Sequence, residues 1–161
     1  YVVGFPDAEI HGVDLGAGLL RYAHPRAEAL GLPIHFKQAC ASATGFTDAS
    51  FDLVVSNILL HEIPREMLDA VMRESFRLLK PGGLVVHQDV PTQRPDTPAF
   101  QQWLSNWQVA HNDEPFWQCF SETSVPDALI SAGFSSEDVF ESYQPQIDGP
   151  LVWYMVGARK S

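Results

Sequence analysis

The chain has 161 residues, 45% of them hydrophobic, and a formal net charge of -10 from 20 acidic and 10 basic residues. This length and composition fit one domain with a sizeable core, and the acidic charge argues against a general nucleic-acid binder or a lipid-seeking surface, because both need a positive field. No apolar run approaches the ~20 residues of a membrane-spanning helix and no signal-peptide pattern is present, so we expect a cytoplasmic location.

The first half of the chain predicts strands that alternate with helices. Residues 9–15 are a short apolar strand that ends in an acid, and residues 34–39 are the next strand. Between them, residues 18–31 predict a helix in which Pro25 produces a kink or a new start. Residues 51–57 are almost continuously apolar, as expected for a strand covered by helices on both faces.

The next segment predicts a helix and a further strand. Residues 64–80 have their apolar side chains on one helical stripe, with Pro64 in the first turn. The "PGG" at 81–83 should end this helix, and residues 84–90 form the strand. Strand, crossover helix and strand in this rhythm predict a parallel sheet with right-handed connections.

The last third has a different pattern. Residues 98–120 are rich in aromatic side chains and begin as a helix, and residues 124–134 predict another helix. Residues 138–144 and 151–159 are two strands joined by a turn around "DGP" at 148–150. This arrangement indicates an antiparallel hairpin at one edge of the sheet.

Polar residues lie at the carboxyl ends of the predicted strands, where open parallel sheets bind ligands. They are Asp14, residues 40–42, Ser56, Asn57 and residues 87–89. An acid such as Asp14 can accept hydrogen bonds from two adjacent ribose hydroxyls. It could equally be a helix N-cap or a turn residue, because a short motif is a weak signal.

Three stretches together resemble a known family. "FPDAEIHGVDL", "ACASATGFTDASFDLVVSNILLHEIP" and "ESFRLLKPGGLVV" are similar to class I S-adenosylmethionine-dependent methyltransferases of the small-molecule type. The resemblance covers roughly residues 5 to 90. It implies an α/β fold with a Rossmann-like sheet, mostly parallel with a C-terminal antiparallel hairpin, and S-adenosylmethionine as the cofactor.

The resemblance also implies a set of cofactor-binding residues. Asp14, followed by Leu15, matches the acid that binds the ribose diol. Cys40 matches a position near the adenine amino group, and the backbone amide of Ala41 meets the ring. Asn57 matches the residue beside the methionine end of the cofactor. Cys40 departs from the family, which often has an aspartate there, and a thiol forms only a weak hydrogen bond.

A larger departure is the missing glycine-rich loop. In nucleotide-binding folds of this type the loop lies about 20 residues before the acid, but only 13 residues precede Asp14. We therefore expect residues 1–161 to be one methyltransferase-like domain that is incomplete at its N-terminus, with the family's first strand outside it. The alternative is a homodimer in which a second copy supplies a substitute strand.

Two histidines are candidates for acid–base chemistry. A general base is needed only if the acceptor nucleophile holds its proton near neutral pH, and His61 is the first candidate, with His111 second. His61 could instead be a helix-start residue with a satisfied ring. "HEIPR" begins like the zinc motif HExxH, but Arg65 stands at the position of the second histidine, so no metal site is expected.

The aromatic segment predicts a cover for the acceptor pocket. Residues 91–123 lie where the family commonly inserts such a cover, and Trp103 and Trp107 share one face of the predicted helix. An aromatic lid would suit an apolar or planar small molecule. Core packing is the alternative explanation for the same residues.

The sequence as a whole predicts methyl transfer to a small-molecule acceptor. "SNIL" at 56–59 is not the NPPY-type motif of methyltransferases that act on nucleic-acid amines, and the net charge also disfavours such a substrate. We expect neither a nucleic-acid nor a membrane partner. Cys40 and Cys119 are far apart, which indicates reduced thiols. The alternative is a non-catalytic, truncated methyltransferase-fold protein that acts in assembly or binding.

Overall fold

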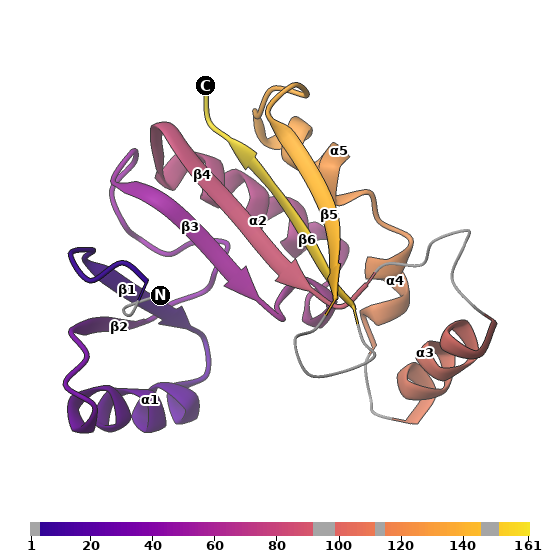
Figure 1. Cartoon of the computed structure of the whole chain (residues 1–161), viewed down its shortest axis with the longest axis horizontal. Coiled ribbons are helices and arrows are strands. Elements are labelled where there is room, and N and C mark those ends of the chain that lie inside the picture. The colour runs from indigo at the N-terminus through magenta and orange to yellow at the C-terminus, as the bar shows by residue number, and fades with distance from the viewer. Residues whose placement is uncertain (1–3, 92–98, 112–114, 146–151) are drawn as a thin grey trace. The chain divides into compact units, whose positions relative to one another are not determined.

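A computed structural model of the chain describes residues 4–91, 99–111, 115–145 and 152–161. The chain folds into two compact units, residues 1–45 and residues 46–161 (Figure 1). Both units combine strands with helices, as the sequence predicts for an α/β protein. Within the described ranges no helix is long and apolar enough to span a membrane.

Unit 1 consists of two parallel strands and one helix. Strand β1 (Ile10–Asp14) pairs in register with β2 (Ile34–Gln38), so that both strands end at the same edge. Helix α1 (Ala17–Ala29) connects them. This is the strand–helix–strand unit that the sequence predicts for residues 9–39.

Pro25 does not interrupt α1, so the predicted new start at this residue is wrong. The helix runs continuously from Ala17 to Ala29 with Pro25 inside it. A proline in this place removes the hydrogen bond to the carbonyl four residues earlier, at Arg21. Both Pro25 and Arg21 are exposed, so solvent can replace the missing donor without ending the helix.

Unit 2 contains a mixed four-stranded sheet with the order β3-β4-β6-β5. Strands β3 (Phe51–Asn57) and β4 (Leu79–Asp89) are parallel. Strands β5 (Val139–Pro145) and β6 (Val152–Arg159) form an antiparallel hairpin, and β6 also pairs antiparallel with β4. The predicted hairpin is confirmed, whereas its turn at 148–150 lies outside the described residues.

The "PGG" sequence belongs to strand β4 and does not separate it from the preceding helix. Helix α2 (Arg65–Leu78) passes directly into β4 at Leu79. The pairing of β3 with β4 shifts between Phe51 and Leu53, and this irregularity accommodates the extra residues of β4. Gly82 takes a φ of 83°, which glycine adopts without strain.

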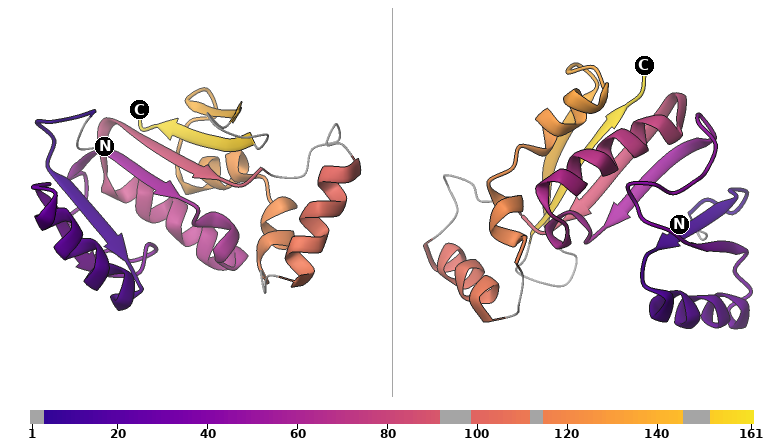
Figure 2. Two further views of the ribbon diagram at one scale, coloured as in Figure 1. Left: turned by 60° about the horizontal axis from the view of Figure 1, so that its bottom comes forward. Right: turned by 180° about the vertical axis from the view of Figure 1, so that it is seen from behind.

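Helices α2 and α5 (Val125–Ala132) contact each other, and α5 also contacts β5 and β6 (Figure 2). Between these helices and the sheet lies the core of unit 2, together with the short helices η1 (Leu60–Glu62) and α4 (Trp117–Ser121). Its largest buried apolar side chains are Tyr154, Phe120, Leu60, Leu68, Met72, Leu79 and Leu129.

The described residues leave the opposite face of β3 partly exposed. Leu53 and Val55 remain 37% exposed, whereas Val54 packs against the core. The expectation that this strand is buried on both faces is therefore wrong. Its apolar run instead gives one core face and one partly exposed face.

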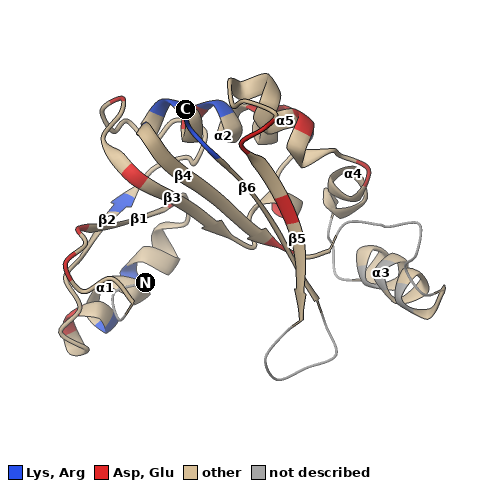
Figure 3. Cartoon of the chain, turned by 45° about the horizontal axis from the view of Figure 1, so that its top comes forward, with Lys and Arg blue, Asp and Glu red and all other residues tan. Residues whose placement is uncertain are grey.

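Basic side chains hold the end of unit 2 where β4 begins (Figure 3). Arg77 pairs with Glu74 at 2.8 Å. Lys160 donates from Nζ to the carbonyls of Phe76 and Leu79 at 2.7 and 2.9 Å, at the C-terminus of α2. A cation at this end of a helix satisfies carbonyls that the helix leaves without a partner. The other end of the sheet carries the candidate site.

Candidate active site

In unit 1, Asp14 lies at the carboxyl end of β1. Its Oδ1 accepts a hydrogen bond from the backbone amide of Gly16 at 2.6 Å, next to the start of α1. The turn role considered from the sequence is therefore real. A carboxylate offers about four acceptor positions, so this one hydrogen bond leaves capacity for further donors such as ribose hydroxyls.

Two hydrogen bonds join the end of β1 to the chain that follows β2. The amide of Ala39 donates to the carbonyl of Asp14 at 3.1 Å. The side-chain amide of Gln38 donates to the carbonyl of Leu15 at 3.0 Å. These contacts bring Asp14 and the exposed Leu15 to the same edge as residues 40 and 41. The four unit 1 residues that the sequence predicts for the cofactor thus share one edge.

Cys40 forms a local turn at that edge. It makes an isolated β-bridge with Ala43, and its Sγ lies 3.1 Å from the Oγ of Ser42. Hydrogen bonds from the side chain and backbone of Ser42 lower the pKa of the Cys40 thiol, against the opposing effect of burial. Neither Cys40 nor Cys119 forms a disulfide among the described residues.

In unit 2, the chain turns sharply where β3 ends. Asn57 is exposed at the end of the strand, and Ile58 has a φ of 54°. This left-handed conformation is unfavourable for a β-branched residue. The amide of Ile58 donates to the carbonyl of Gln88 at 2.9 Å, which fixes the turn against β4. Strained backbone of this kind often occurs at functional sites.

Asp89 anchors the segment after this turn. It is fully buried at the end of β4. Its Oδ2 accepts from the amides of Leu59 and Leu60 at 3.0 and 2.7 Å, and its Oδ1 accepts from the amide of Val90 at 2.7 Å. Hydrogen bonds to a charged acceptor are stronger than neutral ones, so Asp89 compensates for the strain at Ile58.

His61 is held between two carboxylates. Its Nδ1 lies 2.5 Å from Oδ1 of Asp89, and its Nε2 lies 3.3 Å from Oε1 of Glu62. The side chain of His61 is only 3% exposed, whereas that of Glu62 is 53% exposed. The ring of Trp117 makes an edge contact with the imidazole at 5.1 Å. His61 therefore has a defined orientation, in which Nε2 faces the exposed carboxylate of Glu62.

His87 lies nearby on the same strand and is also buried. Its Nδ1 is 2.7 Å from the Oγ of Ser56, on the neighbouring strand. Its Nε2 has no hydrogen-bond partner among the described residues. Burial lowers the pKa of His87 to about 4, although Asp89 acts in the opposite direction. His87 is thus neutral near pH 7.

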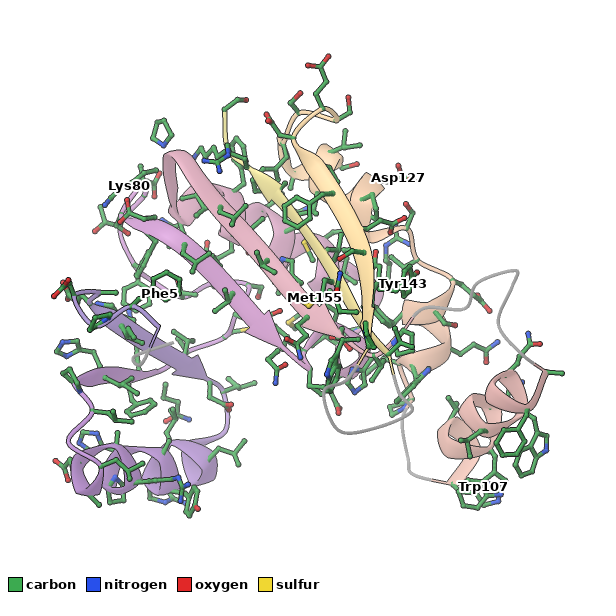
Figure 4. The ribbon with its side chains drawn as sticks, viewed as in Figure 1. Phe5, Lys80, Trp107, Asp127, Tyr143 and Met155 are labelled. Carbon is green, nitrogen blue, oxygen red and sulfur yellow. The ribbon has the colours of Figure 1, made fainter. Side chains whose placement is uncertain are left out.

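The predicted lid residues lie on α3 (Ala99–His111), and Trp107 is labelled in Figure 4. Trp103 and Trp107 are 57% and 45% exposed. Trp103 stacks on Phe100, and Trp107 stacks on His111, whose Nδ1 donates to the carbonyl of Trp107 at 2.7 Å. The contacts of His111 thus lie within α3, whereas those of His61 reach the sheet.

Two residues of this site had no role assigned from the sequence, although Asp89 was among the polar residues noted at strand ends. Asp89 and Glu62 both contact His61 directly. The signal for Asp89 was its position at the end of a strand parallel to the one that ends at Asn57. Within the described ranges no group of three potential metal ligands occurs.

Comparisons with known proteins are consistent with this geometry. Residues 2–83 match the family described as methyltransferase domain. An uncharacterized protein of Haemophilus influenzae is 41% identical over 83 residues, which is 50% of this chain and 33% of that protein. Phosphoethanolamine N-methyltransferase 1 of Arabidopsis thaliana is 31% identical over 126 residues, which is 76% of this chain and 25% of that protein. The chain thus spans a third or less of these two relatives.

A solved structure shares the fold. A SAM-dependent methyltransferase from Methanosarcina mazei superposes with a TM-score of 0.70 at 18% identity, covering 98% of this chain and 84% of that one. At this identity the similarity establishes the Rossmann-like methyltransferase architecture and no more. It confirms the predicted fold class.

Proposed function

The chain belongs to the methyltransferase-domain family, and from this membership we propose that it binds S-adenosylmethionine and transfers a methyl group to a small-molecule acceptor. The observation that carries the proposal is the edge of unit 1 where β1 and β2 end. This edge lies within the family match. It carries Asp14, whose carboxylate can accept further hydrogen bonds, the exposed Leu15, and the local turn at Cys40.

The residues of that edge fit the nucleoside end of the cofactor. The carboxylate of Asp14 would accept from the ribose hydroxyls while Gly16 occupies one of its positions. Leu15 offers an exposed apolar surface for adenine, and the amide of Ala41 a donor. Cys40 is engaged with Ser42 and adds packing more than a strong hydrogen bond. When bound, S-adenosylmethionine supplies an activated methyl group on a sulfonium.

In unit 2, Asn57 and His61 are the residues proposed for the reacting end. His61 is the first candidate for the base that takes a proton from the acceptor, and His111 is the second. The protein's main contribution is to orient the partners and exclude water. His61 is better supported than His111 because its ring is buried and oriented by two carboxylates, whereas His111 is exposed on α3.

The acceptor is proposed to lie under the segment 91–123, with Trp103 and Trp107 as contacts. Both rings are about half exposed, which suits a surface that receives a ligand better than it suits a core. The name of the Arabidopsis relative indicates an amine acceptor for that protein. A small amine or hydroxyl compound is therefore the first class of acceptor to test.

Calorimetry with S-adenosylmethionine tests the proposal. Asp14→Ala should weaken binding at least tenfold, because it removes charge-assisted hydrogen bonds worth roughly 1.5–3 kcal/mol. Asp7→Ala, which removes another exposed carboxylate of unit 1, is the matched control and should bind as the wild type does. Absence of binding by the folded wild-type protein would contradict the proposal. Equal binding by both variants would limit Asp14 to its role in the turn.

A second assay measures methyl transfer. Labelled S-adenosylmethionine is incubated with phosphoethanolamine or with a simple phenol, which represent nitrogen and oxygen acceptors. Transfer to one class would identify the acceptor atom. Binding of the cofactor without transfer to either would leave the cofactor proposal intact and exclude these two compounds as acceptors.

A further inference from the structure

We propose that Asp89 is a positioning residue which holds His61 in one tautomer, so that Nε2 is the atom that takes the acceptor's proton, and that Glu62 passes this proton to solvent. The proposal rests on the proposed function, because it concerns the base of that reaction. It assigns roles to two residues that lie within 3.3 Å of the His61 ring.

The hydrogen bonds of Asp89 determine which nitrogen carries the proton. Asp89 accepts from three backbone amides as well as facing Nδ1 of His61. A carboxylate in this role is an acceptor only, so the proton in the 2.5 Å contact belongs to Nδ1. A neutral imidazole has one N–H. Nε2 is therefore the nitrogen with the lone pair.

The backbone makes this orientation rigid. Oδ2 of Asp89 accepts from the amides of Leu59 and Leu60, and Oδ1 of the same carboxylate contacts the ring of His61, the next residue. The carboxylate thus fixes both the backbone and the side chain of one short segment. On the other side, Trp117 and Phe120 of α4 contact the ring. A ring restrained from the sheet and from α4 cannot flip freely.

Glu62 lies beside Nε2. Its Oε1 is 3.3 Å from that atom, and its side chain is the exposed member of the group. In the proposed step the O–H or N–H proton of the acceptor moves to Nε2, and the bonding electron pair stays on the acceptor atom. The ring is then an imidazolium stabilised by Asp89 and Glu62. The proton leaves through Glu62, which is in contact with water.

Two carboxylates contact His61 from different elements, Asp89 from β4 and Glu62 from η1, while α4 presents aromatic rings. Each carboxylate can therefore be tested separately. Asp89→Asn retains the shape and an oxygen for the amides but removes the obligatory acceptor at Nδ1. Glu62→Gln removes only the exposed charge. Asp52→Asn, at a carboxylate paired with Lys80 on the surface, is the matched control.

Long-range proton–nitrogen NMR correlations of ¹⁵N-histidine-labelled protein distinguish the two tautomers, with His61 assigned from the His61→Gln variant. We expect Nδ1–H in the wild type once the ring is neutral, and the same in Asp52→Asn. Asp89→Asn should populate Nε2–H. Glu62→Gln should retain Nδ1–H and lose the Nε2 proton at lower pH. An Nε2–H tautomer in the wild type, or an unchanged tautomer in folded Asp89→Asn, would overturn the proposal.

The wild-type spectrum identifies the tautomer of His61 even if Asp89→Asn does not fold. Calorimetry with S-adenosylmethionine separates this inference from the proposed function, since a lack of cofactor binding contradicts the function while the tautomer is still measured. With an acceptor in hand, Asp89→Asn should lower kcat by about 10²–10⁴-fold, the usual contribution of a general base. It should also displace the acidic limb of the pH–rate profile, which reports the pKa of a general base, without raising KM in proportion. A merely structural residue would not do this.

Discussion

The two units differ sharply in how their apolar residues are used. Unit 2 buries side chains from its helices and its sheet in one continuous core. In the described part of unit 1, the only apolar residue that is buried is Ala27. The large apolar side chains that unit 1 exposes are Phe5, Leu15, Leu19, Tyr22 and Leu30.

This difference implies that the proposed cofactor edge of unit 1 and the His61 cluster of unit 2 have unequal support from packing. Two strands with one helix are close to the minimum for independent stability, and little burial in unit 1 offsets the loss of chain entropy. The proposed cofactor edge therefore depends on a unit of low local stability. The His61 cluster, by contrast, is attached to a well-packed core. Local opening should be much more frequent in unit 1 than in unit 2.

The largest effect should come from a pair of leucine truncations. Leu68→Ala in α2 removes a fully buried side chain and should lower the free energy of unfolding by about 2–5 kcal/mol. Leu19→Ala in α1 removes one that is 65% exposed and should change it by less than about 0.5 kcal/mol. Urea unfolding of both variants measures the difference. Similar losses would mean that unit 1 is packed as tightly as unit 2.

A proline replacement should strengthen unit 1. Pro25→Ala in α1 restores a helical hydrogen bond and should stabilise the helix by about 2 kcal/mol, once the greater freedom of the unfolded chain is deducted. Amide hydrogen exchange should slow at least tenfold in α1. Pro126→Ala is the control in unit 2, because Pro126 lies in the first turn of α5, where no such bond is lost. Unchanged exchange in α1 would refute the expectation.

The buried His87 should make unit 2 sensitive to acid. Its folded-state pKa of about 4 lies below the ordinary value of 6.5, so the unfolded chain binds the proton more tightly. Stability is therefore complete above pH 6.5 and falls as the pH drops toward 4, by about 2 kcal/mol between pH 7 and pH 5. His87→Leu should abolish this part of the slope in denaturant titrations. His24→Asn on the exposed surface of α1 should retain it, and a slope unchanged in His87→Leu would exclude His87 as its cause.

The smallest stability effect is expected on α3. Trp107→Ala removes a half-exposed ring and should change the free energy of unfolding by less than about 0.5 kcal/mol, while raising KM for the acceptor. Phe120→Ala in the core of unit 2 should cost about 3–5 kcal/mol. Thermal melting separates the two cases. A large loss of stability in Trp107→Ala would identify α3 as part of the core rather than as a lid.

The strand–helix alternation could be predicted because it depends on local apolar patterns. The parallel pairing of β1 with β2 and of β3 with β4, and the antiparallel hairpin of β5 and β6, all follow from such patterns. The boundary at Leu79 could not be predicted, since a bulge in the pairing with β3 lets "PGG" continue a strand. The continuity of α1 through Pro25 could not be predicted either, because it depends on the solvent exposure of Pro25 and of Arg21.

The residues proposed for the cofactor were predicted from the family resemblance together with polar positions at strand ends. The structure places Asp14 and Asn57 at the ends of β1 and β3, and His61 in η1 after β3. The roles of Asp89 and Glu62 depend on contacts between residues up to 30 positions apart. Such contacts are set by the register of β3 with β4 and by the left-handed turn at Ile58. No local pattern predicts an isoleucine in that conformation.

The order of the strands in unit 2 has a consequence for synthesis on the ribosome. Strand β6 pairs with β4, yet roughly 60 residues separate the end of β4 from the start of β6. At translation rates of about 5–20 residues per second, β4 waits several seconds for its neighbour. During that time its open edge can pair with other chains. Codon changes that slow elongation between residues 90 and 151 should therefore increase aggregation of the nascent chain without altering the stability of the finished protein.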